Sequence, residues 1–283
     1  MARRSLVFGD TLSPYTKVFA AGGPQLTVTS TKIEGAAYDS DAQAYFTRAG
    51  ITDADQKTAW NDFVLTGKAD GWWDDLVVVY PALGGNATSH SKNAKSDAYH
   101  VTWSGTVTHD SDGFASDGST GYGNTGWHPN LLADKTSVTL ACYLQGTSGN
   151  TFAFGAHAGG LGYGLGLAAF FGELYVCNND ESDSFLTVAG QSLLGSTIGT
   201  RTTNALATAY RGGVSVGTKA GAVATTGTAN NLYLCCRNDA GTPLYFSSTA
   251  ISFVAIGNGI DGTNAASLHA AIVALQTALG RNV

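Results

Sequence analysis

Charged residues are scarce in this sequence, at 13% of its 283 positions, and the basic ones are scattered. Lys and Arg number 15 and Asp and Glu number 21, a net charge of −6 without a positive patch that could bind a phosphate backbone. Long hydrophobic runs are also missing, and none approaches the roughly 18 apolar residues that a membrane helix needs. We therefore expect neither nucleic acid nor a membrane as a partner.

The chain has only four cysteines, and no two of them have CxxC spacing. This excludes a dense disulfide framework and gives no zinc signature, so buried thiols are the simplest interpretation. Cys235 and Cys236 are adjacent in the strand-like run LYLCCRN, which predicts side chains on opposite faces and at most one in the core. Whether either of them forms a disulfide with a neighbouring subunit is left open by the sequence.

Residues 1–36 lack a core of their own. They alternate apolar and polar residues in short pieces broken by Pro14 and Pro24, and their β-branched content favours extended segments laid against another surface. The apolar run near the start is interrupted at Asp10 and is too short for a secretory signal. We interpret 1–36 as an attachment arm of a protein made in a host cytoplasm.

In residues 37–96 the apolar residues recur with the period of a helix, and a strand pattern follows. A first helix, ended by Gly50, is predicted by the apolar stripe Tyr38, Ala42, Tyr45, Phe46 and Ala49. A second is predicted from Thr52 and Asp55, which resemble a capping box, with an apolar face that runs up to Gly67. The strand LVVVYP follows, so 37–96 is expected to be a helical entry segment with the first strand.

From residue 97 onward the pattern is β almost to the end. Abundant glycine, 37 residues in the chain, and about a dozen short apolar runs at regular spacing predict a two-sheet antiparallel sandwich over 97–283. After the last strand, Ile251–Ile256, a helix is predicted with Thr263 or Asn264 as its cap and one apolar face, formed by Leu268, Ile272, Leu275 and Leu279. The fold class expected is all-β, with this closing helix packed on the sandwich.

Carboxylate residues are the candidates for catalysis and for metal binding. Retaining glucanases use an ExDxxE strand, whereas Glu181–Leu186 reads ExDxxL, so we expect no enzyme, although an Asp pair elsewhere stays open. Asp110 and Asp112, with Asp117 beyond them, could gather Ca²⁺ ligands, but successive Asx turns explain the same residues. No cofactor is expected.

Aromatic residues in glycine-rich loops are the candidate glycan contacts, because a sugar stacks its CH face on an aromatic ring. Tyr122 and Trp127 lie in such a loop with Asn124 between them. A second glycine pattern, in which Gly160, Gly162, Gly164 and Gly166 alternate with larger residues, would give a strand one bare face, or else a loop.

Four segments carry a family resemblance. In chain order they are a helical entry that ends in WWDDLVVVYP, the turn-rich FASDGSTGYGNTGWHPN, the strand segment LYLCCRNDAGTPLYFSSTAISFVAIGNGI and a closing helix that ends in ALGRNV. Over residues 38–283 the chain resembles the laminin-G-like, concanavalin-A-like jelly-roll proteins of bacteriophage virions, found in tail fibres and decoration proteins. The resemblance implies two antiparallel sheets and no catalytic set.

Three functions follow as hypotheses. The first is a structural protein of the virion surface, anchored to other virion proteins through 1–36 and assembled as a homo-oligomer, with a trimer the most plausible form. The second is a carbohydrate-binding lectin for a host surface glycan. A polysaccharide depolymerase is the third and least favoured.

Overall fold

Seventeen strands among the described residues form two sheets, in a computed structural model that describes residues 37–283 except 148, 160–163, 181–184, 204 and 221–225. Sheet A runs in the order β13 (Val214–Ala220), β12 (Leu206–Arg211), β11 (Gly195–Arg201), β6 (Val138–Leu144), β17 (Ile251–Gly257), β4 (Gly113–Ser116), β3 (Val107–Asp110), and β1 (Leu76–Tyr80) also pairs with β17. The last strand in the chain, β17, thus lies inside sheet A.

Sheet B runs in the order β10 (Leu186–Ala189), β9 (Glu173–Asp180), β8 (Gly164–Phe170), β7 (Thr151–His157), β14 (Tyr233–Leu234), β5 (Tyr122–Asn124), β2 (Thr102–Ser104). Two short strands, β15 (Arg237–Asp239) and β16 (Thr242–Leu244), pair with each other, and β15 also runs parallel to β7. All other pairings between the named strands are antiparallel. The predicted two-sheet antiparallel sandwich is confirmed.

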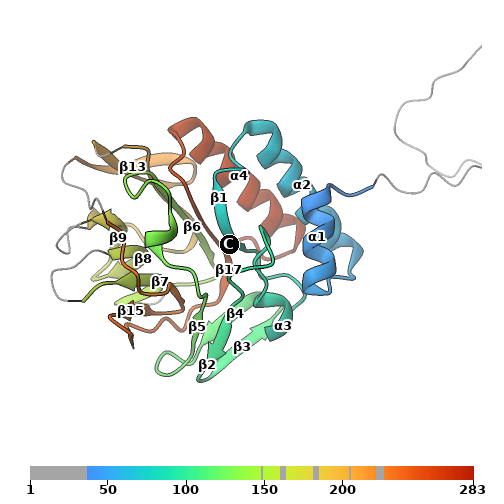
Figure 1. The fold of residues 1–283 in the computed structure, drawn as a ribbon, viewed down its shortest axis with the longest axis horizontal. Coiled ribbons are helices and arrows are strands. Elements are labelled where there is room, and N and C mark those ends of the chain that lie inside the picture. Colours follow the sequence, from blue (N-terminus) through green and yellow to red (C-terminus); the bar gives the residue numbers. More distant parts are fainter. Residues whose placement is uncertain (1–36, 148, 160–163, 181–184, 204, 221–225) are drawn as a thin grey trace, which may run out of the picture. The chain divides into compact units, whose positions relative to one another are not determined.

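Two cores divide the molecule into three layers. The first lies between the sheets and contains Leu140, Phe154, Leu167 and Val254. The second lies between sheet A and the helices α1 (Ser40–Ala49), α2 (Ala54–Asp70) and α4 (Gly262–Ala278), which Figure 1 shows together on one side of the sheets. Sheet A is therefore covered on both faces, which explains why β6, β11 and β17 are buried at every position. Sheet B has its outer face on the side away from these helices.

The helices begin and end largely where the sequence predicts. Ala42, Tyr45, Phe46 and Ala49 form the buried face of α1, and Gly50 ends it in the left-handed conformation. The start predicted for α2, with Thr52 as the cap, is one residue early. Its N-cap is Asp53, whose side chain accepts from Gln56 N, and it continues to Gly71 because Gly67 is an interior contact, where a Cβ would lie 2.6 Å from the Trp72 ring.

The closing helix α4 packs as expected but begins earlier. Asp261 is the N-cap and accepts from Asn264 N at 2.8 Å, in place of a cap at residue 263 or 264. Leu268, Ile272 and Leu275 are buried against sheet A and α2, and Leu279 packs there partly buried. None of the helices in the described part of the chain is long and apolar enough to span a membrane.

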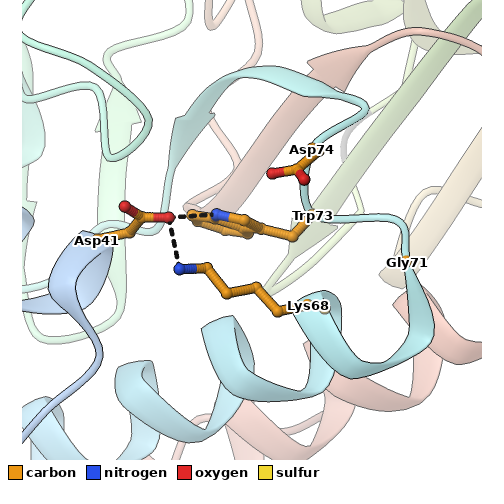
Figure 2. Close-up of a pocket in the computed structure, with 6 residues that line it drawn as sticks. Asp41, Lys68, Gly71, Trp73 and Asp74 are labelled. Carbon is orange, nitrogen blue, oxygen red and sulfur yellow. Dashed lines mark hydrogen bonds and ion pairs between the residues drawn. The ribbon is translucent and has the colours of Figure 1, made fainter.

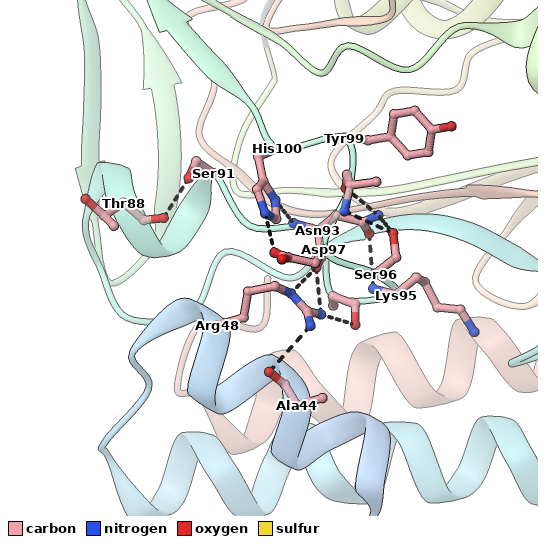
Figure 3. Close-up of polar contacts among 12 residues, drawn as sticks. Ala44, Arg48, Thr88, Ser91, Asn93, Lys95, Ser96, Asp97, Tyr99 and His100 are labelled. Carbon is pink, nitrogen blue, oxygen red and sulfur yellow. Dashed lines mark hydrogen bonds and ion pairs between the residues drawn. The ribbon is translucent and has the colours of Figure 1, made fainter.

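A buried asparagine organises the loop between the short helix α3 (Ala87–His90) and β2. The Asn93 side chain accepts from the main-chain N of Val79 and of Lys95, at 3.0 and 3.1 Å, and donates to Ser96 Oγ and the Ala98 carbonyl. Arg48 on α1 donates to the Asn93 carbonyl (Figure 3). The loop, the helical layer and β1 are thus tied together by one polar residue that is fully buried.

Arg281, just after α4, uses all five of its N–H donors inside the protein. They reach Gln276 Oε1 and the carbonyl oxygens of Pro81, Ala82, Ser111 and Ser252, at 2.6–3.2 Å. Burial lowers the pKa of its guanidinium to about 10. Four of the acceptors come from segments far away in the sequence, so Arg281 joins α4 to the segment after β1, to β17 and to the turn after β3.

Candidate functional site

The predicted glycan residues fall into two groups. Trp127 is fully buried in the core between the sheets, so the exposed ring expected there is wrong: Leu232 N donates to its carbonyl and draws this loop onto sheet B. Tyr122 and Asn124 remain partly exposed on β5. Tyr122 stacks on Tyr233 of β14, with ring centroids 4.7 Å apart and planes 27° apart. As glycan contacts, these two residues stay a prediction.

The outer face of sheet B carries both residues. Tyr233 pairs with Asn124 on one side and with Gly155 of β7 on the other. Directly paired residues in a sheet share a face, and alternate residues of a strand share it too. Tyr122, Asn124 and Gly155 therefore lie on one face of sheet B, opposite the face of Phe154 and Leu234 that enters the core.

The predicted calcium ligands form turns. Asp110 Oδ1 accepts from Asp112 N at 2.9 Å, and Asp117 accepts from the N–H groups of Ser119, Thr120 and Gly121. These bonds, led by the one from the Thr120 hydroxyl, lower the pKa of Asp117. No group of three His, Cys, Asp or Glu side chains in the described part of the chain is placed to hold a metal ion.

Both adjacent cysteines are buried, and of the two only Cys235 belongs to a hydrophobic core cluster, in agreement with the expectation that at most one would face the core. The strand ends at Leu234, and Cys235 takes a left-handed φ of 65° before β15 begins at Arg237. All four cysteines are free and buried, which leaves no thiol of this pair at the surface for a neighbouring subunit.

A charged hollow of about 330 Å³ lies beside α2, lined by Asp41, Lys68, Trp73 and Asp74 (Figure 2). Lys68 Nζ lies 2.8 Å from both Asp39 Oδ1 and Asp41 Oδ2, and Trp73 Nε1 donates to Asp41 Oδ2 at 2.8 Å. The bond from Lys68 is the main cause that lowers the pKa of Asp41. Lys68 of α2 thus pairs with Asp39 and Asp41 at the start of α1, so these contacts fasten the two helices to each other.

An aromatic hollow of about 300 Å³ on sheet B is the better candidate site. It is lined by residues of β7, β8, β9, β15 and the adjoining loops, namely Phe152, Phe170, Phe171, Tyr175, Phe185, Arg237 and Tyr245. The Phe171 side chain is 84% exposed and that of Tyr245 is 43% exposed. We call these seven residues the aromatic site.

Ring contacts hold the aromatic site in one arrangement. Phe170 meets Phe152, Tyr175 and Tyr245 edge to face, with centroids 5.4–5.6 Å apart, and Tyr175 meets Phe185 at 5.8 Å. Such edge-to-face pairs are the preferred geometry of aromatic rings. The rings therefore support one another around the hollow that they line.

One cation is built into the site. The Arg237 guanidinium lies 4.8 Å from the centroid of Tyr245 and 5.3 Å from that of Phe152. Its Nη2 is 2.9 Å from Asp239 Oδ2, and the other oxygen of Asp239 is 3.0 Å from His157 Nδ1. Burial acts to raise the pKa of Asp239, but His157 and Arg237 together lower it, so the carboxylate stays charged and balances Arg237.

Two of the seven non-glycine residues with positive φ in the described part of the chain are the exposed rings of the aromatic site. Phe171 has φ 52° and Tyr245 has φ 57°, in the left-handed region that bulky side chains rarely adopt. The left-handed backbone conformation at each of these two residues costs about 1–2 kcal/mol of stability. Asn150 Oδ1 accepts from Phe171 N, and the Tyr245 carbonyl accepts from Phe152 N, so neighbouring segments hold both residues in place.

Glycines form the floor under Phe152. A Cβ at Gly155 would lie 2.9 Å from Phe152 Cδ1, and one at Gly166 would lie 3.2 Å from it. Two members of the predicted alternating glycine series, Gly164 and Gly166, lie on β8, and the earlier ones fall outside the described residues. The bare strand face that the series predicts is thus present on β8 at Gly166, and an aromatic ring of the same chain lies on it.

Comparisons with known proteins give only distant likenesses of fold. No protein-family model and no curated protein matches this chain. Among solved structures, domain 4 of the extracellular arabinanase AbnA of Geobacillus stearothermophilus, in complex with arabinotriose, is 14% identical, with 69% of this chain and 98% of that domain covered and a TM-score of 0.45.

Two other solved structures are similar at the same level. Trypanosoma rangeli sialidase is 14% identical over 75% of this chain, with a TM-score of 0.49, and the binding domain of botulinum neurotoxin serotype D is 8% identical over 70%, with a TM-score of 0.48. This chain spans 39% of the sialidase and 52% of the neurotoxin domain. The class that the sheets themselves define is a two-sheet, mainly antiparallel, jelly-roll-like β-sandwich with a helical layer on sheet A.

Proposed function

We propose that the protein binds carbohydrate through the aromatic site on the outer face of sheet B. The observation that carries this proposal is the pair Phe171 and Tyr245: two exposed rings, each held at a strained left-handed φ, line the same hollow. Strain of this kind persists where the surrounding structure enforces it, and it concentrates at ligand sites. Exposed rings held at such a cost favour a role in binding.

The chemistry of the hollow suits a sugar. Aromatic faces stack on the CH faces of a sugar ring, while a few polar groups fix its orientation. Here the polar groups are Arg237, the Tyr245 hydroxyl and the Tyr175 hydroxyl, which donates to Glu173 Oε2 at 3.3 Å. Tyr122 and Asn124 lie on the same face of sheet B and extend the proposed surface toward β5.

In this proposal the protein binds carbohydrate without cleaving it and without a cofactor. Retaining hydrolysis needs two carboxyl groups about 5–5.5 Å apart on either side of the bond that is cut. Glu173, the glutamate beside the aromatic site, is hydrogen-bonded to Tyr175. The ExDxxL segment replaces the second glutamate of the glucanase motif with Leu186, and its first four residues lie outside the described part of the chain.

A glycan array followed by calorimetry tests the proposal. We expect the full chain to bind a defined set of host-surface glycans, and Tyr245→Ala and Phe171→Ala each to weaken binding at least tenfold, the equivalent of about 1.4 kcal/mol. Val214→Ala, which removes an exposed side chain from β13 of sheet A, is the matched control and should bind normally. No binding to any glycan, or variants that bind like the control, would count against the proposal. Release of reducing ends would instead indicate a depolymerase.

We further propose that this sandwich is displayed on a bacteriophage virion, as a decoration or tail-fibre protein. The support is the resemblance of 38–283 to virion jelly-roll proteins and the sequence of residues 1–36, which fits an attachment arm to other virion proteins. A homo-oligomer, a trimer in the simplest case, would match symmetric attachment sites.

Co-sedimentation tests the virion proposal. The full chain should pellet with particles that lack it, an excess of a peptide of residues 1–36 should release it, and light scattering should give a mass above that of one chain. A monomer that stays in the supernatant would contradict this role and leave glycan binding untouched.

A further inference from the structure

A second hollow lies at the tip of the hairpin that carries Phe171. It has a volume of about 320 Å³ and is lined by residues of three loops and of β8, namely Thr147, Gly149, Ala169, Gly172, Gly190, Gln191, Ser192 and Leu193. We call it the polar hollow, after Thr147, Gln191 and Ser192.

The β8–β9 turn separates the two hollows. Phe170 lines the aromatic site and Ala169, its neighbour in β8, lines the polar hollow. Successive side chains of a strand point to opposite faces, so the hollows lie on opposite sides of the hairpin. The turn residues follow the same division, with Phe171 in the aromatic site and Gly172 in the polar hollow. The strained, exposed Phe171 ring thus stands on the ridge between them.

Both hollows are small and neither carries net positive charge. Each is at the lower end of the range of about 300–1,000 Å³ seen for small-molecule pockets. The charge of Arg237 is balanced by Asp239, and Glu173 adds a carboxylate at the rim. The described residues that line the polar hollow are uncharged. Among the described residues that line the two hollows, Arg237 is the one cation and it is paired with Asp239, so an anionic sugar would find no free cation among them.

We propose that the ligand is a neutral, linear polysaccharide segment that crosses the β8–β9 ridge and occupies both hollows, an inference that rests on the carbohydrate binding proposed above. Sugar rings stack in the aromatic site and against Phe171, and hydroxyl groups of the next rings hydrogen-bond with Gln191 and Ser192. Binding in two linked hollows makes the second contact intramolecular, so affinity rises with chain length.

The test is calorimetry of the full chain with size-fractionated neutral oligosaccharides of whichever series binds on the array, from the disaccharide upward. Affinity should rise on the order of tenfold or more between short and long members and then level off. Gln191→Ala should remove this gain and leave the affinity for short members unchanged, while Tyr245→Ala should weaken every length. Gln43→Ala, on the exposed side of α1, is the matched control.

The outcomes separate the two proposals. If Tyr245→Ala weakens binding but short and long members bind equally, or Gln191→Ala keeps the length dependence, two-hollow binding is wrong and the aromatic site stands. If uronic-acid or sialylated chains bind more tightly than neutral ones, the neutral ligand is wrong. Should Tyr245→Ala bind every length like the wild type, carbohydrate binding at this site fails as well.

Discussion

Arg281 Nη1 donates a hydrogen bond of 3.0 Å to the carbonyl oxygen of Ser111, 170 positions earlier in the chain. The same guanidinium satisfies four further acceptors, so Arg281→Met would leave several buried carbonyl groups without a donor. Each buried carbonyl group left without a donor costs about 1–3 kcal/mol of stability. We expect the free energy of unfolding, measured with urea, to fall by on the order of 3 kcal/mol or more. Arg281→Lys should recover only part of it, and a change below 1 kcal/mol would contradict this role.

Replacing Phe171 by glycine should stabilise the fold and weaken glycan binding. Because its side chain is mostly exposed and its φ is 52°, Phe171→Gly should raise the free energy of unfolding by about 1 kcal/mol, since glycine adopts this conformation without penalty. The same variant should bind glycan more weakly. Phe171→Ala is the control, as it removes the ring and keeps the strain. If glycine and alanine variants were equally stable, strain at this turn would be negligible.

The thiols should be unreactive in the native protein. Burial raises the pKa of Cys235 to about 12 and also raises that of Cys236 and Cys142, and the thiolate is the reactive form. A thiol reagent at pH 8 should modify none of these three within minutes, and should modify all of them once denaturant is added. A band shift between reducing and non-reducing gels would instead show the disulfide between subunits that the sequence left open.

His90 should stay neutral far into the acid range. Burial, with His109 Nδ1 only 3.1 Å from His90 Nδ1, lowers the pKa of His90 to about 3. The unfolded chain binds this proton near pH 6.5, so the contribution of His90 to stability is complete above that pH and is lost as the pH falls from about 6.5 to 3. The NMR signal of the His90 ring should not titrate above pH 4, whereas that of an exposed histidine titrates near 6.5.

The periodic parts of the fold were predictable from the sequence. The stripes of α1 and α4 and the apolar runs of β6, β7 and β17 gave the right elements, because burial on one layer imposes a regular period. Strands such as β11, with the sequence GSTIGTR, and the exposed edge strand β13 were missed. Their residues are polar or small, and they become strands only by pairing with β6 and β12.

The aromatic site could not be predicted from the same patterns. Strict alternation would put Phe152 and Phe154 on one face of β7, but a register shift between them sends Phe154 into the core and Phe152 over Gly155. Tyr245 joins the cluster from a loop 93 positions later, through a backbone conformation that no local signal requires. Trp127, one of the two aromatic residues predicted as glycan contacts, is instead buried in the core, and its carbonyl accepts from Leu232 N.

The place of β17 in sheet A bears on how the protein is made. While the nascent chain is still on the ribosome, β6, β4 and β1 have been synthesised but lack the strand that joins them, and their unpaired edges can pair wrongly. The two cores can close only after residues 251–281 emerge. Closure of sheet A therefore waits for the synthesis of β17, and the edges of β1, β4 and β6 that it will cover stay open until then.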